Sequence, residues 1–280
     1  MIRSRNPLIT LALHILLGLL ATVSILPFVW VVCASVKTGD DLFNHTFLPP
    51  GGFDRLTVEN FVRICRERPL ISWVVNSTFL ASTHTVIVVL LSSLGGFALA
   101  KYDFPGKRPL MLLMLATMLL PGQVILPSLY EQVDRLGWVN NYAGILVPGA
   151  VSVFGMFLFR QAMRGVPDEL IAAARVDGCS ELRVWWDVAL PCVRPMVGAY
   201  TLMAFLGTWN SFLWPQLVLK DESKYTLPIG LSTLTSLQEY QADYGVIMAG
   251  TVISIAPVMV VFLLLQRELI EGLTTGAVKG

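Results

Sequence analysis

Six long apolar runs, separated by short polar segments, dominate the pattern of hydrophobic and polar positions. They cover residues 8–33, 71–100, 110–129, 143–159, 196–219 and 245–265. About 20 consecutive apolar residues in a helix cross the hydrocarbon core of a bilayer. The pattern therefore predicts an all-α polytopic membrane protein with six transmembrane helices.

The basic residues orient these predicted spans. With the N-terminus inside, twelve of the 20 Lys and Arg residues fall in inner segments, and the short outer loops hold only Arg135, Lys220 and Lys224. The other five lie in the longer first outer loop, residues 34–70. Because short loops rich in Lys and Arg stay in the cytoplasm, both termini are expected there. We therefore expect the chain to be a multi-pass protein of a bacterial or archaeal cytoplasmic membrane, in contact with lipid.

Composition agrees with this interpretation and narrows it. The chain is 55% hydrophobic and 14% charged, with a mean hydropathy of +0.67 and a net charge of +1. These values exclude an ordinary soluble domain and give no basic surface for nucleic acid. Residues 1–280 are therefore interpreted as a single transmembrane domain. The four cysteines form no Cys-x-x-Cys pair, and no metal site is expected.

The predicted spans contain no Asp, Glu, Lys or Arg, so no group inside the membrane is an obvious binder of a driving ion. His14 and His84 are the intramembrane histidines, and His84 either lines a polar path or bonds a neighbouring helix. No Gly-x-x-x-x-Gly-Lys-Ser/Thr phosphate loop occurs either, so the chain is not expected to hydrolyse ATP. An energised partner is required, and ATP and Mg would belong to that partner. No cofactor and no catalytic residue are expected in this chain.

Segment 160–195 is the candidate contact with that partner. Pro167 suits a first helical position, Asp168 and Glu169 place negative charge in the positive first turn, and Gly178 permits a left-handed stop. A second helix is expected from Ser180, as its cap, to Leu190. We expect this second helix to carry an apolar stripe on one face and an Arg183–Asp187 pair on the opposite face. The stripe comprises Leu182, Trp185, Trp186 and Ala189. The alternative is a solvated hairpin whose tryptophans lie among lipid headgroups.

This segment resembles the cytoplasmic coupling loop of importer permeases of the ATP-binding-cassette (ABC) class. The family pattern is Glu-Ala-Ala, three residues, Asp-Gly, and Leu-Pro about twelve residues later. Ala173-Ala174, Asp177-Gly178 and Leu190-Pro191 match in register, whereas Ala172 stands where the pattern has Glu. Glu169, one turn earlier on nearly the same face, is expected to supply the missing carboxylate.

The resemblance to maltose-type carbohydrate permeases extends along the chain. It includes Ser35-Val36-Lys37-Thr38, Asn76-Ser77, Trp209-Asn210 and the C-terminal residues 272–280. It implies a heterodimer with a second homologous permease, two ATP-binding subunits and an extracytoplasmic solute-binding protein. In that scheme ATP binding closes the ATPase dimer, and the coupling helices transmit the motion that turns the permease outward.

A candidate substrate path consists of Trp209, Asn210, Gln216, His84 and Asn76. Aromatic faces stack on sugar rings and amides bond hydroxyls, so these residue types suit a sugar. The competing interpretation is packing between helices. The expected function is uptake of a sugar or oligosaccharide. Uptake of glycerol phosphate or another polyol, and an ion-coupled secondary carrier, are the alternatives.

Overall fold

The computed structural model describes residues 7–48, 56–236 and 244–277, apart from the side chains of 39, 40, 43, 236 and 267–277. The described residues form helices joined by short loops, with one isolated bridge between Lys37 and Leu56. The first helices are α1 (Pro7–Ser35), α2 (Gly39–Asn44), α3 (Glu59–Glu67), α4 (Leu70–Lys101), α5 (Lys107–Thr117), α6 (Gly122–Arg135), α7 (Ala143–Leu146) and α8 (Val153–Met163). The others are α9 (Asp168–Val176), α10 (Glu181–Arg183), a π-helix (Val184–Ala189), α11 (Leu190–Cys192), α12 (Arg194–Trp209), α13 (Leu213–Val218), a 3₁₀ turn (Glu222–Lys224), α14 (Leu227–Ser236) and α15 (Tyr244–Ala277).

Three helices are long and apolar enough to cross a membrane without a break: α1, α4 and the Tyr244–Gln266 part of α15. They confirm the helices predicted at 8–33, 71–100 and 245–265. Two bent helix pairs raise the number of candidate spans among the described residues to five. The chain is thus an all-α polytopic membrane protein with three to five candidate spans.

The other three predicted spans are not continuous helices. The predicted span 110–129 divides into α5 and α6, which are bent by 99°. Pro121 at the start of α6 has no backbone N–H to continue a helix. The predicted span 143–159 divides into α7 and α8 around Pro148-Gly149. The predicted span 196–219 divides at Asn210, and the helical run Glu181–Cys192 bends by 89° into α12.

The chain forms two compact units. The first unit comprises residues 1–70 and 231–255, and the second comprises 71–230 and 256–280. In the first unit the Ser35–Thr38 segment ends α1, and Lys37 is buried with its Nζ donating to the backbone oxygen of His45. Asn60 donates to the backbone oxygens of Ser35 and Lys37 at 2.9 and 2.8 Å, which ties α3 to that segment.

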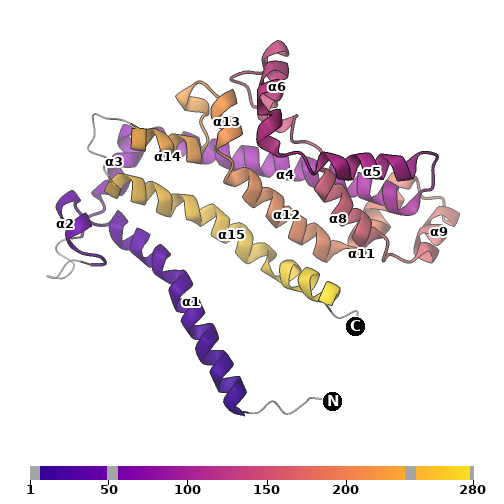
Figure 1. Cartoon of the computed structure of the whole chain (residues 1–280), viewed down its shortest axis with the longest axis horizontal. Helices are drawn as coiled ribbons and strands as arrows, with labels where there is room; N and C mark the ends of the chain where they lie inside the picture. The colour runs from indigo at the N-terminus through magenta and orange to yellow at the C-terminus, as the bar shows by residue number, and fades with distance from the viewer. Residues whose placement is uncertain (1–6, 49–55, 237–243, 278–280) are drawn as a thin grey trace. The chain divides into compact units, whose positions relative to one another are not determined.

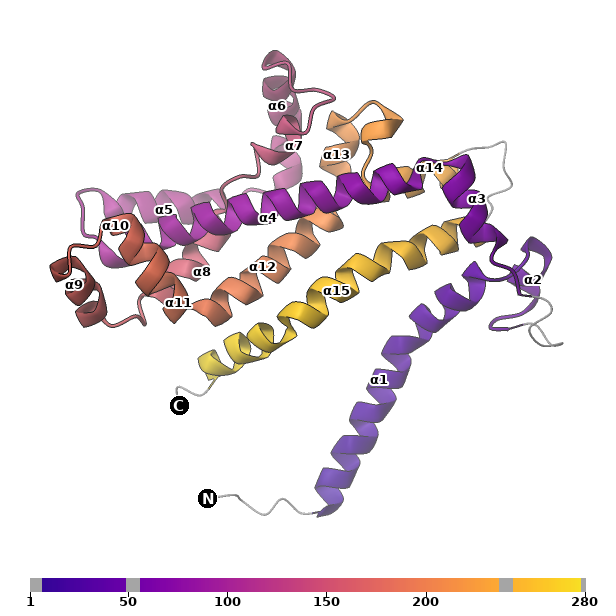
Figure 2. The same cartoon turned by 180° about the vertical axis from the view of Figure 1, so that it is seen from behind.

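The second unit contains most of α4, helices α5–α13 and the C-terminal part of α15. Gly96 lets α8 approach α4 closely, because it carries no side chain. A Cβ at Gly96 would lie 2.8 Å from the backbone nitrogen of Arg160. Helix α8 packs in turn on α12. Figures 1 and 2 both show α9 and α11 gathered at the C-terminal end of α4, with α13 toward its other end. The second unit therefore carries the polar segment 160–195 at one end of a helical core.

Candidate functional site: the coupling segment and an adjoining cavity

Helix α9 is the first part of the candidate contact segment. It begins at Asp168, with Pro167 in the N-cap position at φ −59°, ψ 135°, so the prediction that Pro167 is the first helical residue is wrong by one position. The extended ψ of Pro167 is not helical, so the residue precedes the helix instead of belonging to it. Asp168 and Glu169 occupy the first turn, where the exposed backbone N–H groups favour negative charge.

Helix α9 ends at the predicted glycine. Gly178 has a φ of 78°, and a Cβ there would meet nothing within 4 Å. This left-handed conformation favours glycine. The N–H of Cys179 bonds the oxygen of Ala174 at 3.0 Å, and the N–H of Gly178 bonds that of Arg175 at 3.1 Å. This pair of bonds is the Schellman arrangement, which satisfies the last carbonyls of a helix. The predicted helix stop is confirmed.

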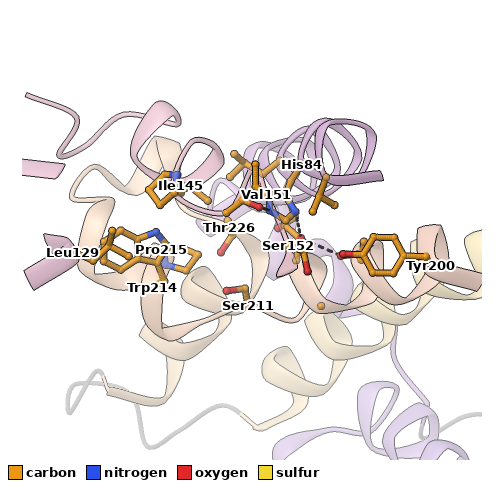
Figure 3. A pocket seen from close by; sticks show the side chains of 18 residues that line it. His84, Leu129, Ile145, Val151, Ser152, Tyr200, Ser211, Trp214, Pro215 and Thr226 are labelled. Atoms are coloured by element: carbon orange, nitrogen blue, oxygen red, sulfur yellow. Dashed lines mark hydrogen bonds between the residues drawn. The ribbon is translucent and has the colours of Figure 1, made fainter. Parts of the chain in front are cut away.

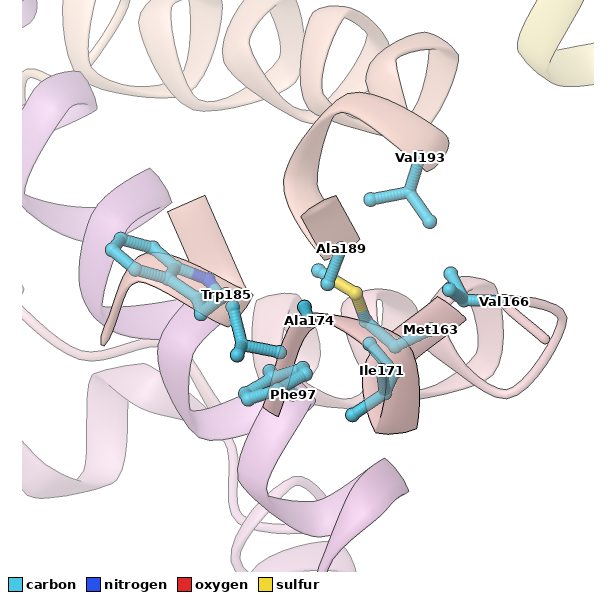
Figure 4. Close-up of a cluster of buried hydrophobic side chains, with 9 residues drawn as sticks. Phe97, Met163, Val166, Ile171, Ala174, Trp185, Ala189 and Val193 are labelled. Atoms are coloured by element: carbon cyan, nitrogen blue, oxygen red, sulfur yellow. The ribbon is translucent and has the colours of Figure 1, made fainter. Parts of the chain in front are cut away.

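One face of α9 is fixed to the membrane helices. Ile171 and Ala174 are buried in a cluster that includes Phe97 from α4 and Met163 from α8 (Figure 4). The other members are Val166, Val184, Trp185, Ala189 and Val193. Ala174 therefore belongs to the core of the segment and is not part of its outer face. A helix held on a packed cluster of this kind moves with the elements beneath it.

The last residue of α4 holds the start of α9. Lys101 Nζ lies 2.6 Å from Asp168 Oδ1 and 2.5 Å from the backbone oxygen of Val166. The lysine side chain is only 6% exposed, whereas that of Asp168 is 87% exposed. The hydrogen bond from Lys101, together with its charge, lowers the pKa of the Asp168 carboxyl. The Asp168 carboxyl therefore stays ionised at neutral pH.

The next residue, Tyr102, holds the end of α9. Its hydroxyl donates to Glu181, which also accepts two hydrogen bonds from Arg175 at 2.9 and 3.1 Å. The Arg175 guanidinium lies over the Tyr102 ring, 5.5 Å from its centroid, a favourable cation–π arrangement. The bonds from Arg175 and then Tyr102 lower the pKa of Glu181, while burial, followed by the bond to Glu181, raises the pKa of Tyr102. Lys101, the last residue of α4, and Tyr102, the residue that follows it, thus hold the two ends of α9.

The opposite face of α9 is open. Glu169, Ala172, Ala173 and Val176 are exposed, with Val176 at 88%. We call these four residues the coupling face. Asp177 and Gly178 are exposed beside it. Farther along, Leu190 is half-buried against the cluster and Pro191 is exposed. The structure therefore brings the predicted residues of α9 together on one surface, except for Ala174.

The second helix of the segment departs from its predicted register. Residues 184–189 form a π-helix, which has more residues per turn than an α-helix. Trp185 and Ala189 are buried, but Leu182 and Trp186 are exposed, so the predicted stripe is wrong for half of its members, and Val184 is buried instead. Ser180 occupies the N-cap position without a side-chain cap bond. Within the described part of the chain, no ion pair joins Arg183 to Asp187.

A cavity of about 470 Å³ lies within the second unit and is lined by α4, α12, α13 and the α7–α8 connection (Figure 3). His84 lines it and holds its wall together. Its Nε2 lies 2.9 Å from the backbone oxygen of Gly149, and its Nδ1 lies 2.8 Å from Thr208 Oγ1. Because a carbonyl only accepts, Nε2 donates the bond to Gly149, and the Thr208 hydroxyl donates to the backbone oxygen of Ala204 at 3.0 Å.

The other four predicted substrate-path residues lie away from this cavity lining. Trp209 is buried and stacks on Phe205 at 5.8 Å between ring centroids. Asn210 is exposed and bonds the carbonyl of Leu206, and Gln216 is exposed. Asn76 donates to the backbone oxygens of Ser223 and Tyr225 at 2.8 and 3.0 Å. Asn76 thus fastens the 222–225 loop to α4, which is a structural role.

Sequence reasoning did not select most of the polar lining residues. They come from distant parts of the chain and are Ser77, Ser152, Thr208, Ser211, Trp214 and Thr226. Serine and threonine are common in membrane helices, so composition gave no signal for the set. Ser211 and Trp214 follow Trp209-Asn210 closely in the sequence, and this proximity was the available clue for both. In the part of the chain that the structure describes, no group of three or more His, Cys, Asp or Glu residues could hold a metal ion.

Comparisons with known proteins agree with this arrangement. Residues 71–273 match the family model described as "Binding-protein-dependent transport system inner membrane component". The arabinooligosaccharides transport system permease protein AraQ of Halalkalibacterium halodurans is 35% identical over 279 residues, 99% of each chain. The diacetylchitobiose uptake system permease protein NgcG of Streptomyces coelicolor is 29% identical over 265 residues, 94% of this chain and 87% of that protein.

A solved structure shares the fold. It is a bacterial ABC transporter involved in the import of the acidic polysaccharide alginate, with a TM-score of 0.83 at 22% identity, covering 96% of this chain and 99% of that one. The family match spans both the coupling segment and the cavity. The chain is therefore a permease subunit of an ABC transporter and belongs to the family of binding-protein-dependent inner-membrane transport components.

Proposed function

We propose that this permease imports a sugar or oligosaccharide delivered by an extracytoplasmic solute-binding protein. The names of the relatives support this substrate class, since AraQ and NgcG belong to uptake systems for arabinooligosaccharides and diacetylchitobiose. Its assembly comprises a second, homologous permease and two ATP-binding subunits. ATP and Mg are used by those subunits, and this chain contributes the path and the coupling contact.

The proposed topology has six crossings with both termini in the cytoplasm. The distribution of Lys and Arg supports it, because segment 160–195 contains five Arg residues and the α4–α5 connection contains Lys101, Lys107 and Arg108. Three crossings are the continuous helices α1, α4 and α15. The other three are made by broken helices, whose freed backbone groups are satisfied inside the protein. The bond from His84 to Gly149 is one such case.

The observation that carries the proposal is the attachment of α9. Lys101 and Tyr102 hold its two ends to α4, and Ile171 and Ala174 anchor its inner face, while the coupling face is left exposed. A partner that docks on this face and moves will move α4 with it. Closure of an ATPase dimer is such a motion, so ATP binding in the partner changes the conformation of the membrane helices.

Transport in proteoliposomes tests this proposal. The complex is purified from the membranes of its own cells through a tag on this chain and reconstituted with its solute-binding protein outside and Mg-ATP inside. The panel contains labelled arabinotriose, maltotriose, diacetylchitobiose and sn-glycerol 3-phosphate. We expect ATP-dependent uptake of a saccharide that is insensitive to proton and sodium ionophores. Uptake driven by an ion gradient without ATP would identify a secondary carrier, and uptake of the phosphate alone would identify the other substrate class.

A further inference from the structure

A second, smaller cavity lies where the C-terminal end of α4 meets α5 and α8, helices that Figures 1 and 2 show side by side. Its volume is about 290 Å³. Arg108 from the first turn of α5 and Arg160 from the last turn of α8 line it, and the other described lining residues are all apolar. We propose that this cavity binds an anionic phospholipid of the cytoplasmic leaflet, a role separate from transport of the solute.

The two guanidinium groups lie at the same end of the cavity and have donors to spare. Arg160 is half-buried and donates its Nε to the backbone oxygen of Leu99 at 3.3 Å, with no other side-chain bond within the described chain. Arg108 is exposed and makes no hydrogen bond or ion pair with the described residues. Its neighbour Lys107 donates to the backbone oxygen of Tyr102 at 2.7 Å. Both arginines therefore lie beside the C-terminal end of α4.

The cavity is polar at that end and apolar along its length. Leu115 follows Arg108 by seven residues on α5, and Val153 precedes Arg160 by seven residues on α8. A helix rises about 1.5 Å per residue, so each wall extends about 10 Å from its guanidinium group along apolar surface. Leu112, another lining residue, is 68% exposed, so the cavity opens onto an exposed apolar face of α5. A headgroup beside the arginines and an acyl chain along this wall match that polarity.

The charge of the site defines the headgroup. Among the described lining residues there is no Asp or Glu, so the two positive charges have no counter-charge in the wall. A guanidinium binds phosphate oxygens through parallel N–H bonds. In the proposed topology this end of α4 lies at the cytoplasmic face, where basic pockets between membrane helices bind the headgroups of anionic lipids.

Two other occupants fit the cavity less well. A free anion such as inorganic phosphate would pair with the arginines but would leave the apolar wall uncovered. An apolar helix of a neighbouring subunit would cover the wall but would bury the guanidinium groups without a counter-charge, which is costly. An anionic phospholipid satisfies both parts of the cavity.

Photo-labelling with lipids tests the site. The intact transporter complex is placed in phosphatidylcholine nanodiscs that contain a trace of either phosphatidylglycerol or phosphatidylcholine with a diazirine on one acyl chain. After irradiation, mass spectrometry maps the labelled peptides. The measured quantity is the ratio of phosphatidylglycerol label to phosphatidylcholine label on residues 108–115 and 153–160.

A matched pair of variants separates this site from general attraction of lipid to basic residues. Arg108→Gln removes a charge that has no partner in the described chain, so folding should be unchanged. Arg164→Gln removes the same charge from an exposed arginine at the C-cap of α8, one turn beyond Arg160 and outside the cavity lining.

Each basic residue near a membrane surface raises the preference for anionic lipid by about fivefold. We therefore expect a label ratio of about 25 in the wild type and in Arg164→Gln, and of about 5 in Arg108→Gln. Excess inorganic phosphate at matched ionic strength should leave these ratios unchanged.

A wild-type ratio near one, or equal ratios in the two variants, would overturn the site. Loss of the preference on addition of inorganic phosphate would assign the arginines to a free anion, and absence of label from these residues would show that another protein covers the cavity. Either result would also overturn the lipid site. Uptake of the solute is measured separately, so the proposed function stands or falls independently.

Discussion

Lys101 Nζ lies 2.6 Å from Asp168 Oδ1, so the last residue of α4 is bonded to the first residue of α9. The neighbouring residue Tyr102 bonds Glu181, which holds Arg175 at the other end of α9. A helix fixed at one end can pivot, whereas a helix fixed at both ends and packed along one face moves as a rigid part of its support. We therefore expect α4 to follow any movement of α9.

Lys101→Met should lower the coupling of ATP hydrolysis to transport. The variant keeps the apolar stem of a side chain that is almost fully buried, but frees Asp168 and leaves the carbonyl of Val166 without its ammonium donor. We expect a lower ratio of saccharide transported to ATP hydrolysed, with the ATP-binding subunits still attached. The matched control is Lys224→Met, which likewise removes an ammonium that bonds a backbone oxygen, that of Asn140, and pairs with a carboxylate, that of Asp221, but has no contact with α9. Equal ratios in the two variants would show that the Lys101 bond does not transmit motion.

Gly178→Val should disturb the end of α9 through the backbone alone. A Cβ at Gly178 meets nothing within 4 Å, so the cost of the substitution lies in the left-handed φ of 78°. That conformation costs about 1–2 kcal/mol for an ordinary residue and more for a β-branched one. We expect normal insertion with reduced ATPase attachment and transport. Gly178→Asn should be milder, because asparagine tolerates this conformation. Co-purification and uptake measure both variants, and normal uptake by the valine variant would contradict the role of the turn.

The attachment of α9 should persist across the physiological pH range. The pKa values of Asp168 and Glu181 are lowered from their ordinary values of 3.8 and 4.5. Their ion pairs are therefore fully formed above those values and are lost only as pH falls below them. Protection of the backbone amides of 169–176 against hydrogen exchange, corrected for intrinsic rates, should be constant from about pH 5.5 to 8. Protection that falls as pH drops from 8 to 6 would show that other groups hold the helix.

Hydropathy predicted three helices correctly and three others incompletely, and two of the breaks have the same physical reason. An apolar run specifies burial in lipid but does not specify an unbroken helix, because Pro121 and Pro148 interrupt the backbone ladder without making the run more polar. The prolines were visible in the sequence, yet which of them would break a helix depends on partners such as His84, 65 residues away from the carbonyl it satisfies.

The coupling segment was predictable to the extent that local rules determine it. The Asp-Gly stop follows from the conformational freedom of Gly178, and the acidic first turn follows from the helix dipole. The exposure of Trp186 was not predictable, because a π-helix changes the spacing on which the stripe was based. The attachment of Asp168 to Lys101 depends on a contact between distant residues, which no local pattern reports.

Glu169→Arg should impair attachment of the ATP-binding subunit, and Ala172→Glu should partly rescue it. Both positions are exposed on the coupling face one helical turn apart, so either can present a carboxylate to the same basic group of a partner. A charge-assisted bond in a largely desolvated contact is worth about 1.5–3 kcal/mol, which is roughly a 10- to 150-fold change in affinity. Titration of the solubilised permease pair with ATP-binding subunit measures the effect. Unchanged affinity in the arginine variant would mean that Glu169 contributes no contact.

Photo-crosslinking from Val176 tests the central claim most directly, because this residue is 88% exposed on the coupling face. A benzophenone amino acid replaces Val176 in one variant and Val124 in the control, an equally apolar residue of α6 that is 69% exposed. Irradiation of the intact complex in membranes should link position 176 to the ATP-binding subunit, and position 124 should give no such product. The same product from position 124, or none from position 176 in a complex that still transports, would contradict docking of the ATPase on the coupling face.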